Sequence, residues 1–408
     1  MSTSTRRVLD FRCCPPLEAY GALFRMKASL VKRRRVAGKP GLRTITPAMG
    51  MVGLPGAVEA WWNEIDEAGV SAVCANGRFT DDHGSIEAYT LADLQRKYAG
   101  RFYGLVWIDL DQDIYESLAA IEKAITQLGL RGIYFESDVR TGDGPVNPDS
   151  PLLFPIYETM QTLGAPVMWS ARPFAGRDIA FAVGVASIDR VLKAFPRLTI
   201  VIGHAGYPYV NEAMTAAATY PNLYICPDMY MWHAPRTWWA KNLTALPHRF
   251  IYGSAYPFAS IQDPLIATLE LPITDAVMES YLWANGARVL GIAQTDADIG
   301  DVVLHYLRAL NGENVDAIVE HYAADAVLFT HDGSFRGAGQ LRRYFTEHLR
   351  NRPRDLVRTF QILQHTIVDD AVYVLWKAEP YVTFASDSYV VRHGKIVLQT
   401  WASRGVAG

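Results

Sequence analysis

Hydrophobic positions in the first 290 residues fall into short, nearly continuous apolar runs separated by longer amphipathic stretches. Continuous runs rich in β-branched and aromatic residues are typical of strands buried on both faces, as in parallel sheets. Eight such runs occur, at 8–13, 71–77, 102–109, 131–137, 165–171, 198–206, 222–228 and 249–255. Helical periodicity lies between most of them, as at Tyr115–Leu128 and Ile188–Ala194. This alternation predicts an α/β fold, a (β/α)8 TIM-like barrel, whose long first connection (15–70) forms a loop and helix over the barrel mouth.

The pattern changes after Gly291. Helices are predicted first, at 299–310, 315–322 and 337–350, together with strands at 326–331, 357–367, 371–379, 382–391 and 395–402. The last two strands meet at a hairpin turn in which Gly394 supplies the positive φ. Helices followed by a curved antiparallel sheet predict a smaller α+β cone. With the boundary in the polar segment 292–297, the domains are 1–293 and 297–408.

Composition narrows the classes of function. Half of the 408 residues are hydrophobic and the formal net charge is -3, which gives no electrostatic case for nucleic acid or acidic membranes. The basic run at 32–35 is read as a solvated or anion-contacting loop. The start of the chain lacks a signal peptide's apolar core, and four cysteines form neither a disulfide framework nor a zinc pair. We expect a cytoplasmic protein that binds a small molecule, without nucleic acid or membrane, as a homodimer.

The stretch 199–208 reads TIVIGHAGYP, a buried strand that runs directly into a loop carrying His204. Polar residues at the C-terminal ends of parallel strands are where barrel enzymes keep their chemistry. An imidazole exchanges protons near neutral pH, so His204 is the predicted general acid or base. The alternative is a structural histidine that caps the loop.

The stretches VLDFRCCPP, VIGHAGYP, YPNLYICPDMY, GSAYPF and YLWANGARVLGI give the first part a resemblance to the amidohydrolase-2 group of the amidohydrolase superfamily. The second part, with AIVEHYAADAVLF, FRGAGQLRRYF and SYVVRHGKIV, resembles the SnoaL-like branch of the nuclear-transport-factor-2-like superfamily. The first resemblance implies metal-assisted hydrolysis, decarboxylation or hydration. The second implies small-molecule cyclases, isomerases and dehydratases, or non-catalytic pockets.

The metal ligands that the first resemblance implies are largely replaced. The first-strand His-x-His corresponds to Arg12-Cys13-Cys14, the fifth-strand His to Ser170 and the eighth-strand Asp to Ala255, so that only His204 remains. We therefore predict no metal or other cofactor. A divalent metal such as zinc, held by His204, Cys14, Asp228 and Glu136, stays an alternative.

Other polar residues at strand ends complete the predicted site. Arg12 is expected to hold an anionic oxygen, or else to pair with Asp10 or Glu136 as a structural cation. Asp228 is expected to orient His204 or act as a base, or else to cap the next element. Glu136 is the fourth catalytic candidate, with a structural ion pair as its alternative. Substrate contacts are predicted at Ser170, Arg172, Tyr207, Tyr230, His233 and Tyr256.

The second domain is expected to enclose a pocket lined by Tyr344, His365, Trp376 and Tyr389. An acid–base pair of the kind that the SnoaL-like resemblance implies has His331 with Asp332, or His365 with Asp387, as candidates. Dimerisation or a structural role is the alternative for this domain.

Three hypotheses follow. The first is a metal-independent acid–base enzyme that acts on a carbonyl-bearing aromatic or polyketide-like molecule, as a lyase, cyclase or isomerase in specialised biosynthesis. The second is a metal-dependent hydrolase or decarboxylase with altered ligands. The third is a non-catalytic barrel that binds a ligand or serves as a scaffold, with the second domain as the working or dimerising part.

Overall fold

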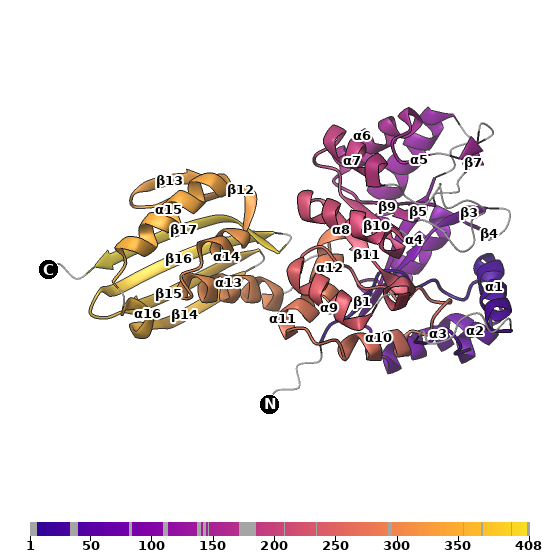
Figure 1. The fold of residues 1–408 in the computed structure, drawn as a ribbon, viewed down its shortest axis with the longest axis horizontal. Helices are drawn as coiled ribbons and strands as arrows, with labels where there is room; N and C mark the ends of the chain where they lie inside the picture. The colour runs from indigo at the N-terminus through magenta and orange to yellow at the C-terminus, as the bar shows by residue number, and fades with distance from the viewer. Residues whose placement is uncertain are drawn as a thin grey trace. The chain divides into compact units, whose positions relative to one another are not determined.

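The computed structural model describes residues 6–32, 40–80, 84–108, 113–136, 140–141, 144–145, 147–170, 185–207, 209–233, 235–292, 296–353, 355–368, 370–392 and 394–405. The chain forms two compact units, Met1–Gly291 and Ile292–Gly408 (Figure 1). Each unit is described by itself below. In the described ranges no helix is both long and apolar enough to cross a membrane.

A parallel sheet forms the centre of the first unit. Its described strands are, in spatial order, β1 (Leu9–Asp10), β2 (Ala72–Asn76), β5 (Phe102–Trp107), β6 (Gly132–Glu136), β9 (Val167–Ser170), β10 (Ile200–Gly203) and β11 (Leu223–Cys226). Every neighbouring pair is parallel. Seven of the eight predicted strands are therefore confirmed, and the order in space follows the order in the chain.

The eighth apolar run closes the barrel without forming a regular strand. Phe250 bridges to Ile225 of β11, and Tyr256 bridges to Cys13 just after β1. The backbone N–H of Phe11 also donates to the carbonyl of Tyr252 at 3.0 Å. Pairing on this side is irregular because Asp10 Oδ1, rather than a backbone carbonyl, accepts the N–H of Ser254 at 2.8 Å. The prediction of a regular strand over 249–255 was wrong, although the position of the segment between β11 and β1 agrees with a barrel.

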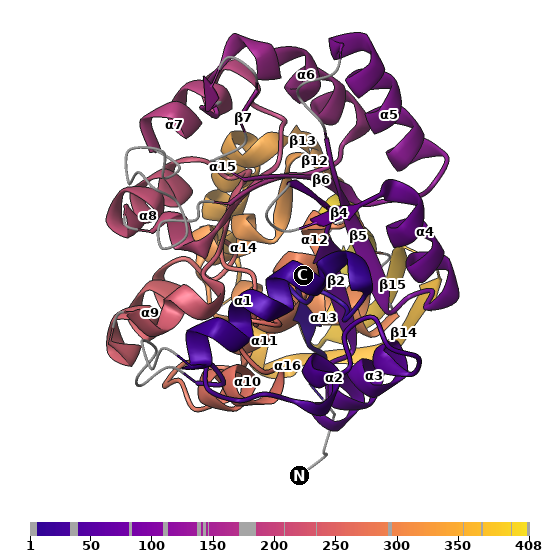
Figure 2. The same cartoon turned by 90° about the vertical axis from the view of Figure 1, so that its right-hand side faces the viewer.

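Helices surround these strands as an outer ring (Figure 2). They are α4 (Ala88–Lys97), α5 (Ile114–Thr126), α6 (Phe154–Leu163), α7 (Val185–Ala194), α8 (Val210–Thr219), α9 (Arg236–Ala245), α10 (Gln262–Leu269), α11 (Asp275–Glu279) and α12 (Asn285–Val289). The predicted helices at 115–128 and 188–194 are α5 and α7. Short pieces complete the unit: β3 (Arg78–Thr80), β4 (Gly84–Ile86), β7 (Arg140–Thr141), β8 (Gly144–Pro145), and single turns at Glu18–Tyr20, Pro151–Leu153, His204–Gly206, Asp228–His233 and Ser280–Ala284.

The long first connection folds into α1 (Gly21–Lys32), α2 (Pro47–Gly50) and α3 (Ala57–Glu67). The buried Lys27 fixes it to the barrel, because its ammonium donates to the carbonyls of Leu42 at 2.6 Å and Phe258 at 2.7 Å. Burial lowers the pKa of Lys27 to about 8. A buried ammonium with carbonyl acceptors on two segments ties the connection to the end of the barrel.

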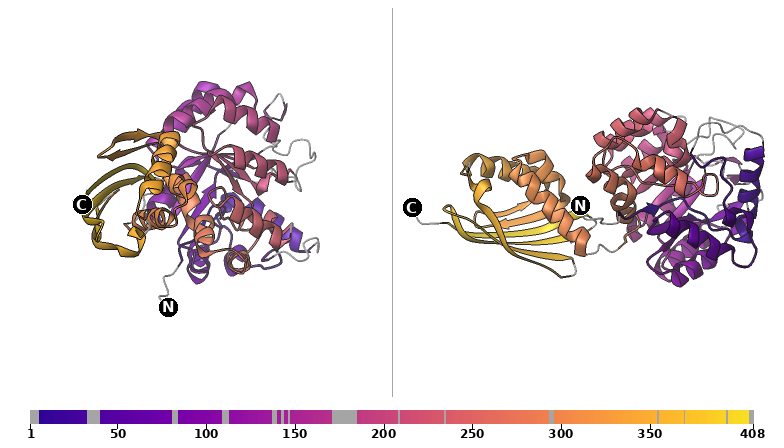
Figure 3. Two further views of the ribbon diagram at one scale, coloured as in Figure 1. Left: turned by 60° about the vertical axis from the view of Figure 1, so that its left-hand side comes forward. Right: turned by 90° about the horizontal axis from the view of Figure 1, so that it is seen from below.

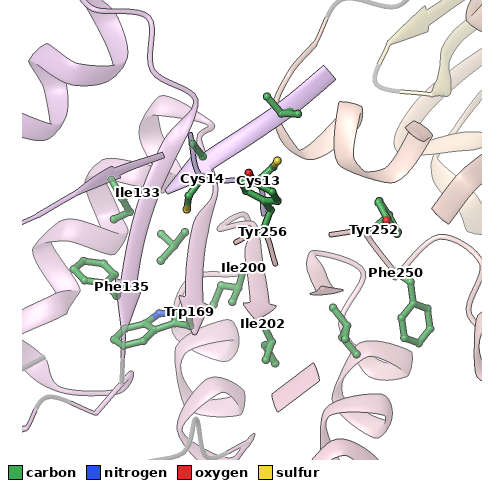
Figure 4. Close-up of a cluster of buried hydrophobic side chains, with 14 of the residues drawn as sticks. Cys13, Cys14, Ile133, Phe135, Trp169, Ile200, Ile202, Phe250, Tyr252 and Tyr256 are labelled. Atoms are coloured by element: carbon green, nitrogen blue, oxygen red, sulfur yellow. The ribbon is translucent and has the colours of Figure 1, made fainter. Parts of the chain in front are cut away.

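Aromatic and aliphatic side chains fill the space between strands and helices. Phe135 of β6 stacks on Trp169 of β9 with ring centroids 5.1 Å apart (Figure 4). Gly132 lets the same two strands approach, since a Cβ there would lie 2.5 Å from the carbonyl oxygen of Pro166. The core that positions the strand ends is therefore close-packed at this pair.

The second unit is a curved sheet with helices on one face (Figure 3). Its elements are α13 (Asp296–Asn311), α14 (Val315–Glu320), β12 (Tyr322–Thr330), β13 (Gly333–Arg336), α15 (Gly337–Asn351), α16 (Leu356–Thr359), β14 (Phe360–Val368), β15 (Ala371–Ala378), β16 (Val382–Arg392) and β17 (Lys395–Gly405). The sheet order is β13-β12-β17-β16-β15-β14. Arg392 pairs with Lys395 across the predicted hairpin, and Gly394 has φ +70. The predicted α+β cone is confirmed, with β13 as an added edge strand, but its sheet is mixed and not antiparallel throughout, because β12 and β17 pair in parallel.

Replacing Gly132 by Ala tests the packing of the barrel strands. The new methyl group would meet a backbone carbonyl that cannot move without breaking the β6–β9 pairing, so we expect a loss of about 3 kcal/mol in the free energy of unfolding. Gly50→Ala is the matched control, because nothing lies within 4 Å of the added Cβ. Urea unfolding of the full chain measures both variants, and equal stabilities would contradict the packing argument.

Candidate active site at the end of the barrel strands

Three predicted catalytic residues meet at the C-terminal ends of the barrel strands. Arg12 follows β1, His204 follows β10 and Asp228 follows β11. Arg12 Nη1 lies 2.8 Å from Asp228 Oδ2, and His204 Nδ1 lies 2.8 Å from the same oxygen. The three residues are 7%, 6% and 3% exposed. Residues separated by up to 216 positions in the chain thus form one buried, charged cluster.

The backbone is strained where these side chains leave their strands. His204, Asp228 and Ala255 have φ of +55, +44 and +62, in the left-handed region that L-residues rarely adopt. Such strain costs about 1–3 kcal/mol for each residue and clusters at functional sites. The turn at His204 is held by its own backbone N–H, which donates to Asp228 Oδ2 at 3.2 Å. The strained turns direct both side chains into the cluster.

Asp228 orients the His204 imidazole. Nδ1 lies 2.9 Å from Oδ1, and because an ionised carboxylate only accepts hydrogen bonds, Nδ1 carries the proton. Burial raises the pKa of Asp228, but the charges of His204 and Arg12 outweigh burial and hold that pKa below its usual value. With Nδ1 committed to Asp228, Nε2 is the nitrogen that chemistry can use.

Arg12 is enclosed by partners from several strands. Nη1 donates to Ser170 Oγ at 3.3 Å, and Nη2 donates to Tyr134 Oη at 3.3 Å. Nη1 also lies 3.0 Å from both ring nitrogens of His204, so the guanidinium and the imidazole are in direct contact. Asp10, the partner considered from the sequence, instead accepts the backbone N–H of Arg12 at 3.1 Å.

Two glycines leave room for the guanidinium. A Cβ at Gly203 would lie 3.3 Å from Arg12 Nη1, and a Cβ at Gly253 would lie 3.3 Å from Arg12 Cβ. Both glycines end barrel segments next to the cluster. In the sequence these are the glycines directly before His204 and Ser254. A larger side chain at either position would crowd the Arg12 side chain.

Tyr134 is a site residue that the sequence reasoning missed. It lies on β6 and is fully buried. The prediction at this strand was Glu136, whose backbone pairs with Ser170 but whose side chain lies outside the described residues. Residues two apart on a strand share a face, so the argument made for Glu136 applied equally to Tyr134.

Aromatic rings flank the imidazole. The ring of Tyr230 lies 4.5 Å from that of His204, and Tyr207 lies 5.5 Å from Tyr230. Burial raises the pKa of Tyr230, so its hydroxyl stays protonated. Tyr230 therefore packs on the His204 ring, and Tyr207 packs on Tyr230 in turn.

The remaining predicted contacts of the barrel are placed differently. Tyr256 is buried, and its hydroxyl donates to Glu64 at 3.3 Å and lies 3.3 Å from Thr46 Oγ1, which fixes the first connection to the barrel. Arg172 and the His233 side chain lie outside the described residues, as do positions 33–35 of the basic run.

The donors of this cluster do not fit the divalent metal that the family resemblance implies. In the described part of the chain, no three His, Cys, Asp or Glu side chains gather closely enough to hold a metal ion. Burial also raises the pKa of Cys14 although Arg78 and Arg12 lie near it, so it is a thiol and not a thiolate ligand.

The second unit contains a cavity of about 230 Å³. Trp376, Asp387 and Gln399 line its inner end, where Trp376 Nε1 donates to Asp387 Oδ2 at 2.7 Å and Gln399 Nε2 donates to Oδ1 at 3.2 Å. Burial raises the pKa of Asp387 to about 6. His348, which the sequence reasoning missed, lies at this cavity, and burial lowers its pKa to about 4.

Two residues predicted for this pocket lie elsewhere. His365 is exposed because β14 is the edge strand of the sheet, and β15 separates it from Asp387 on β16. Tyr389 is buried against Tyr306 in the core, with ring centroids 5.6 Å apart. Tyr344 lines an adjoining groove, of which His331 and His348 are also part. His331 and Asp332 lie in the turn after β12, where His331 Nε2 is 3.3 Å from Asp332 Oδ1 and both side chains are exposed.

Comparisons with known proteins cover both units. A family model described as amidohydrolase matches residues 55–292, more than half of the chain, and one described as SnoaL-like domain matches residues 303–399. No curated protein matches the chain.

Solved structures match the barrel. An uncharacterised TIM-barrel protein from Bordetella bronchiseptica is 27% identical with a TM-score of 0.60, covering 70% of this chain and 98% of its own. A 2,6-dihydroxybenzoate decarboxylase from Rhizobium is 15% identical with a TM-score of 0.51, again covering 70% and 98%. A 2,6-dihydroxybenzoate decarboxylase complexed with 2,6-dihydroxybenzoate is 16% identical with a TM-score of 0.50 and the same coverage. The two decarboxylases share the fold.

Removing one charge of the Arg12–Asp228 pair should be far worse than removing both. Asp228→Asn leaves a buried guanidinium without its counter-charge, and we expect it to lower the free energy of unfolding by about 3–5 kcal/mol. Adding Arg12→Met should recover most of that loss. The control Asp66→Asn breaks an exposed pair with Arg101 and should cost less than about 1 kcal/mol. Urea unfolding of the wild type, the two single variants and the double variant measures these free energies. If the losses of the single variants simply add in the double variant, the two charges do not stabilise each other.

Asp387 should make stability depend on pH in the direction opposite to Asp228. A carboxyl whose pKa is raised on folding stabilises the fold fully below its unfolded pKa, and this contribution is lost as pH rises through the folded pKa, here about 6. We expect the stability of Asp387→Asn relative to the wild type to improve by about 2–3 kcal/mol between pH 4 and pH 7. Urea unfolding at both pH values measures this, and a difference that does not change with pH would contradict it.

Proposed function

The chain belongs to the amidohydrolase family, and we propose that its barrel is an acid–base lyase for a small aromatic carboxylate or carbonyl compound, with decarboxylation as the first reaction to test. The observation that carries this proposal is the buried contact of Arg12, His204 and Asp228. It combines a fixed positive charge with an oriented proton carrier, the two groups that such a reaction needs.

Each residue has a defined part in the proposed step. Arg12 holds the carboxylate oxygen of the substrate by charge-assisted hydrogen bonds. Protonated His204 delivers its proton from Nε2 to the ring carbon that bears the carboxylate. The bond from that carbon to the carboxyl carbon then breaks, its electron pair restores the aromatic ring, and CO2 leaves. His204 regains a proton from solvent, while Asp228 keeps Nδ1 protonated and the ring in place.

The surroundings of His204 support an aromatic substrate. The Tyr230 ring packs beside the imidazole and the Tyr207 ring packs on Tyr230, and offset or edge-on contacts between aromatic rings are favourable. The fold likeness to 2,6-dihydroxybenzoate decarboxylases supports starting with hydroxybenzoates. Ser170 lies beside Arg12, where it can help to fix the same oxygen.

A second candidate function belongs to the second unit. Its cavity has aromatic walls and one buried acid, Asp387, which suits a small apolar ligand carrying a hydroxyl or carbonyl group. In this alternative the barrel is a scaffold or binding module and the second unit does the work. Binding of a panel of hydroxybenzoates by a variant that lacks His204 distinguishes the barrel function from this alternative.

The test of the barrel function is CO2 release from a panel of hydroxybenzoates by the full chain, with the reaction repeated in D2O. We expect one deuterium at the carbon that lost CO2, and His204→Gln should lower kcat by about 10²–10⁴-fold because a positioned proton donor contributes that much. His365→Gln, on the exposed edge strand, is the matched control and should keep full activity. A folded His204→Gln variant with full activity would overturn the proposal.

A further inference from the structure

The cation of the barrel cluster is part of the chain. Arg12 Nη1 lies 2.8 Å from Asp228 Oδ2 and 3.0 Å from the His204 ring nitrogens, in contact with both groups that a bound metal would have to share. These are hydrogen-bond distances, whereas zinc binds nitrogen and oxygen ligands at about 2.0–2.2 Å.

The separation of His204 and Asp228 leads to the same conclusion. Two ligands on one tetrahedral zinc lie about 3.3 Å apart, because each is about 2.0–2.1 Å from the metal at the tetrahedral angle. Here His204 Nδ1 lies 2.8 Å from Asp228 Oδ2 and 2.9 Å from Oδ1, and its proton makes a charge-assisted hydrogen bond to Oδ1. A metal on both groups would have to displace that proton and push the two residues apart.

Arg12 has little freedom to leave this position. Its guanidinium is held by Ser170 and Tyr134 as well as by Asp228. Moving it away would leave the Asp228 carboxylate, which is fully buried, without its permanent counter-charge. An entering divalent ion would therefore have to displace the packed Arg12 side chain first.

We propose that Arg12 is the built-in cation of this barrel, in contact with both His204 and Asp228 and keeping divalent metals away from them. A guanidinium stays charged at every pH of interest and cannot be removed by a chelator. Because Arg12 and Asp228 together carry no net charge, the proton on His204 is what makes the trio positive. The ligand class that fits is a monocarboxylate bound by hydrogen bonds, and this last step rests on the proposed function.

The experiment measures metal binding directly and needs no substrate. The full chain and its variants are incubated with Zn²⁺ or Mn²⁺ and gel-filtered, and their metal content and melting temperature are recorded. We expect the wild type and Arg12→Lys to keep less than about 0.1 metal per chain, with no rise in melting temperature, because only a ligand that binds the native state raises it. Arg12→His removes the guanidinium and offers a third ligand, so it should retain close to one Zn²⁺ and melt several degrees higher with zinc.

Two controls assign the metal to this site. Adding His204→Ala to Arg12→His should abolish zinc retention, and Arg101→His, which changes an exposed arginine, should retain no metal. A wild-type chain that holds about one metal and loses it with His204→Ala overturns the proposal. A folded Arg12→His variant that takes up no zinc overturns it too, since the guanidinium would then not be what keeps the metal out.

The outcomes also separate this proposal from the proposed function. If no hydroxybenzoate is turned over while the metal results hold, the decarboxylase proposal fails and the built-in cation stands. If CO2 release is observed but is abolished by chelation and restored by Mn²⁺, the built-in cation fails and the decarboxylase stands. The wild-type measurement alone decides the metal question even if an Arg12 variant fails to fold.

Discussion

The contact between the Arg12 guanidinium and the Asp228 carboxylate sets the conditions for the rest of the barrel site. Both groups are buried, and a buried charge is tolerated only when it is paired and hydrogen-bonded. The structure meets this demand with Ser170, Tyr134 and His204 around the guanidinium, and with the backbone N–H of His204 on the carboxylate. The left-handed turns at His204 and Asp228 follow from the same demand, since they direct the two groups at each other.

Barrel closure and site formation use the same residues. Asp10 accepts the backbone N–H groups of Arg12 and Ser254, which joins β1 to the eighth segment beside the cluster. Burial raises the pKa of Asp10, although these hydrogen bonds favour its ionised form. A regular eighth strand would have satisfied the same backbone groups with carbonyls.

The sequence was sufficient for the architecture and for the central trio because both depend on local patterns. Apolar runs ending in polar residues located seven strands, and parallel strands bring their carboxyl ends to one edge, which grouped Arg12, His204 and Asp228. The sequence was insufficient where contacts between distant segments decide which side chains meet. Tyr134 and Glu136 share a strand face, and only the structure places Tyr134 on Arg12. His365 was predicted to line the pocket, but it lies on β14, which is an edge strand. His348 was not predicted because it lies on helix α15, and the prediction considered polar residues at strand ends.

The side chains present in the cluster of Arg12, His204 and Asp228 also bear on the type of reaction. Hydrolysis needs a base to activate water, and the Asp228 carboxylate is already in contact with Arg12 and His204. Decarboxylation needs less: a fixed charge for the carboxylate and one proton for the carbon that it leaves. In the proposed reaction, Arg12 would hold the carboxylate and His204 would deliver the proton.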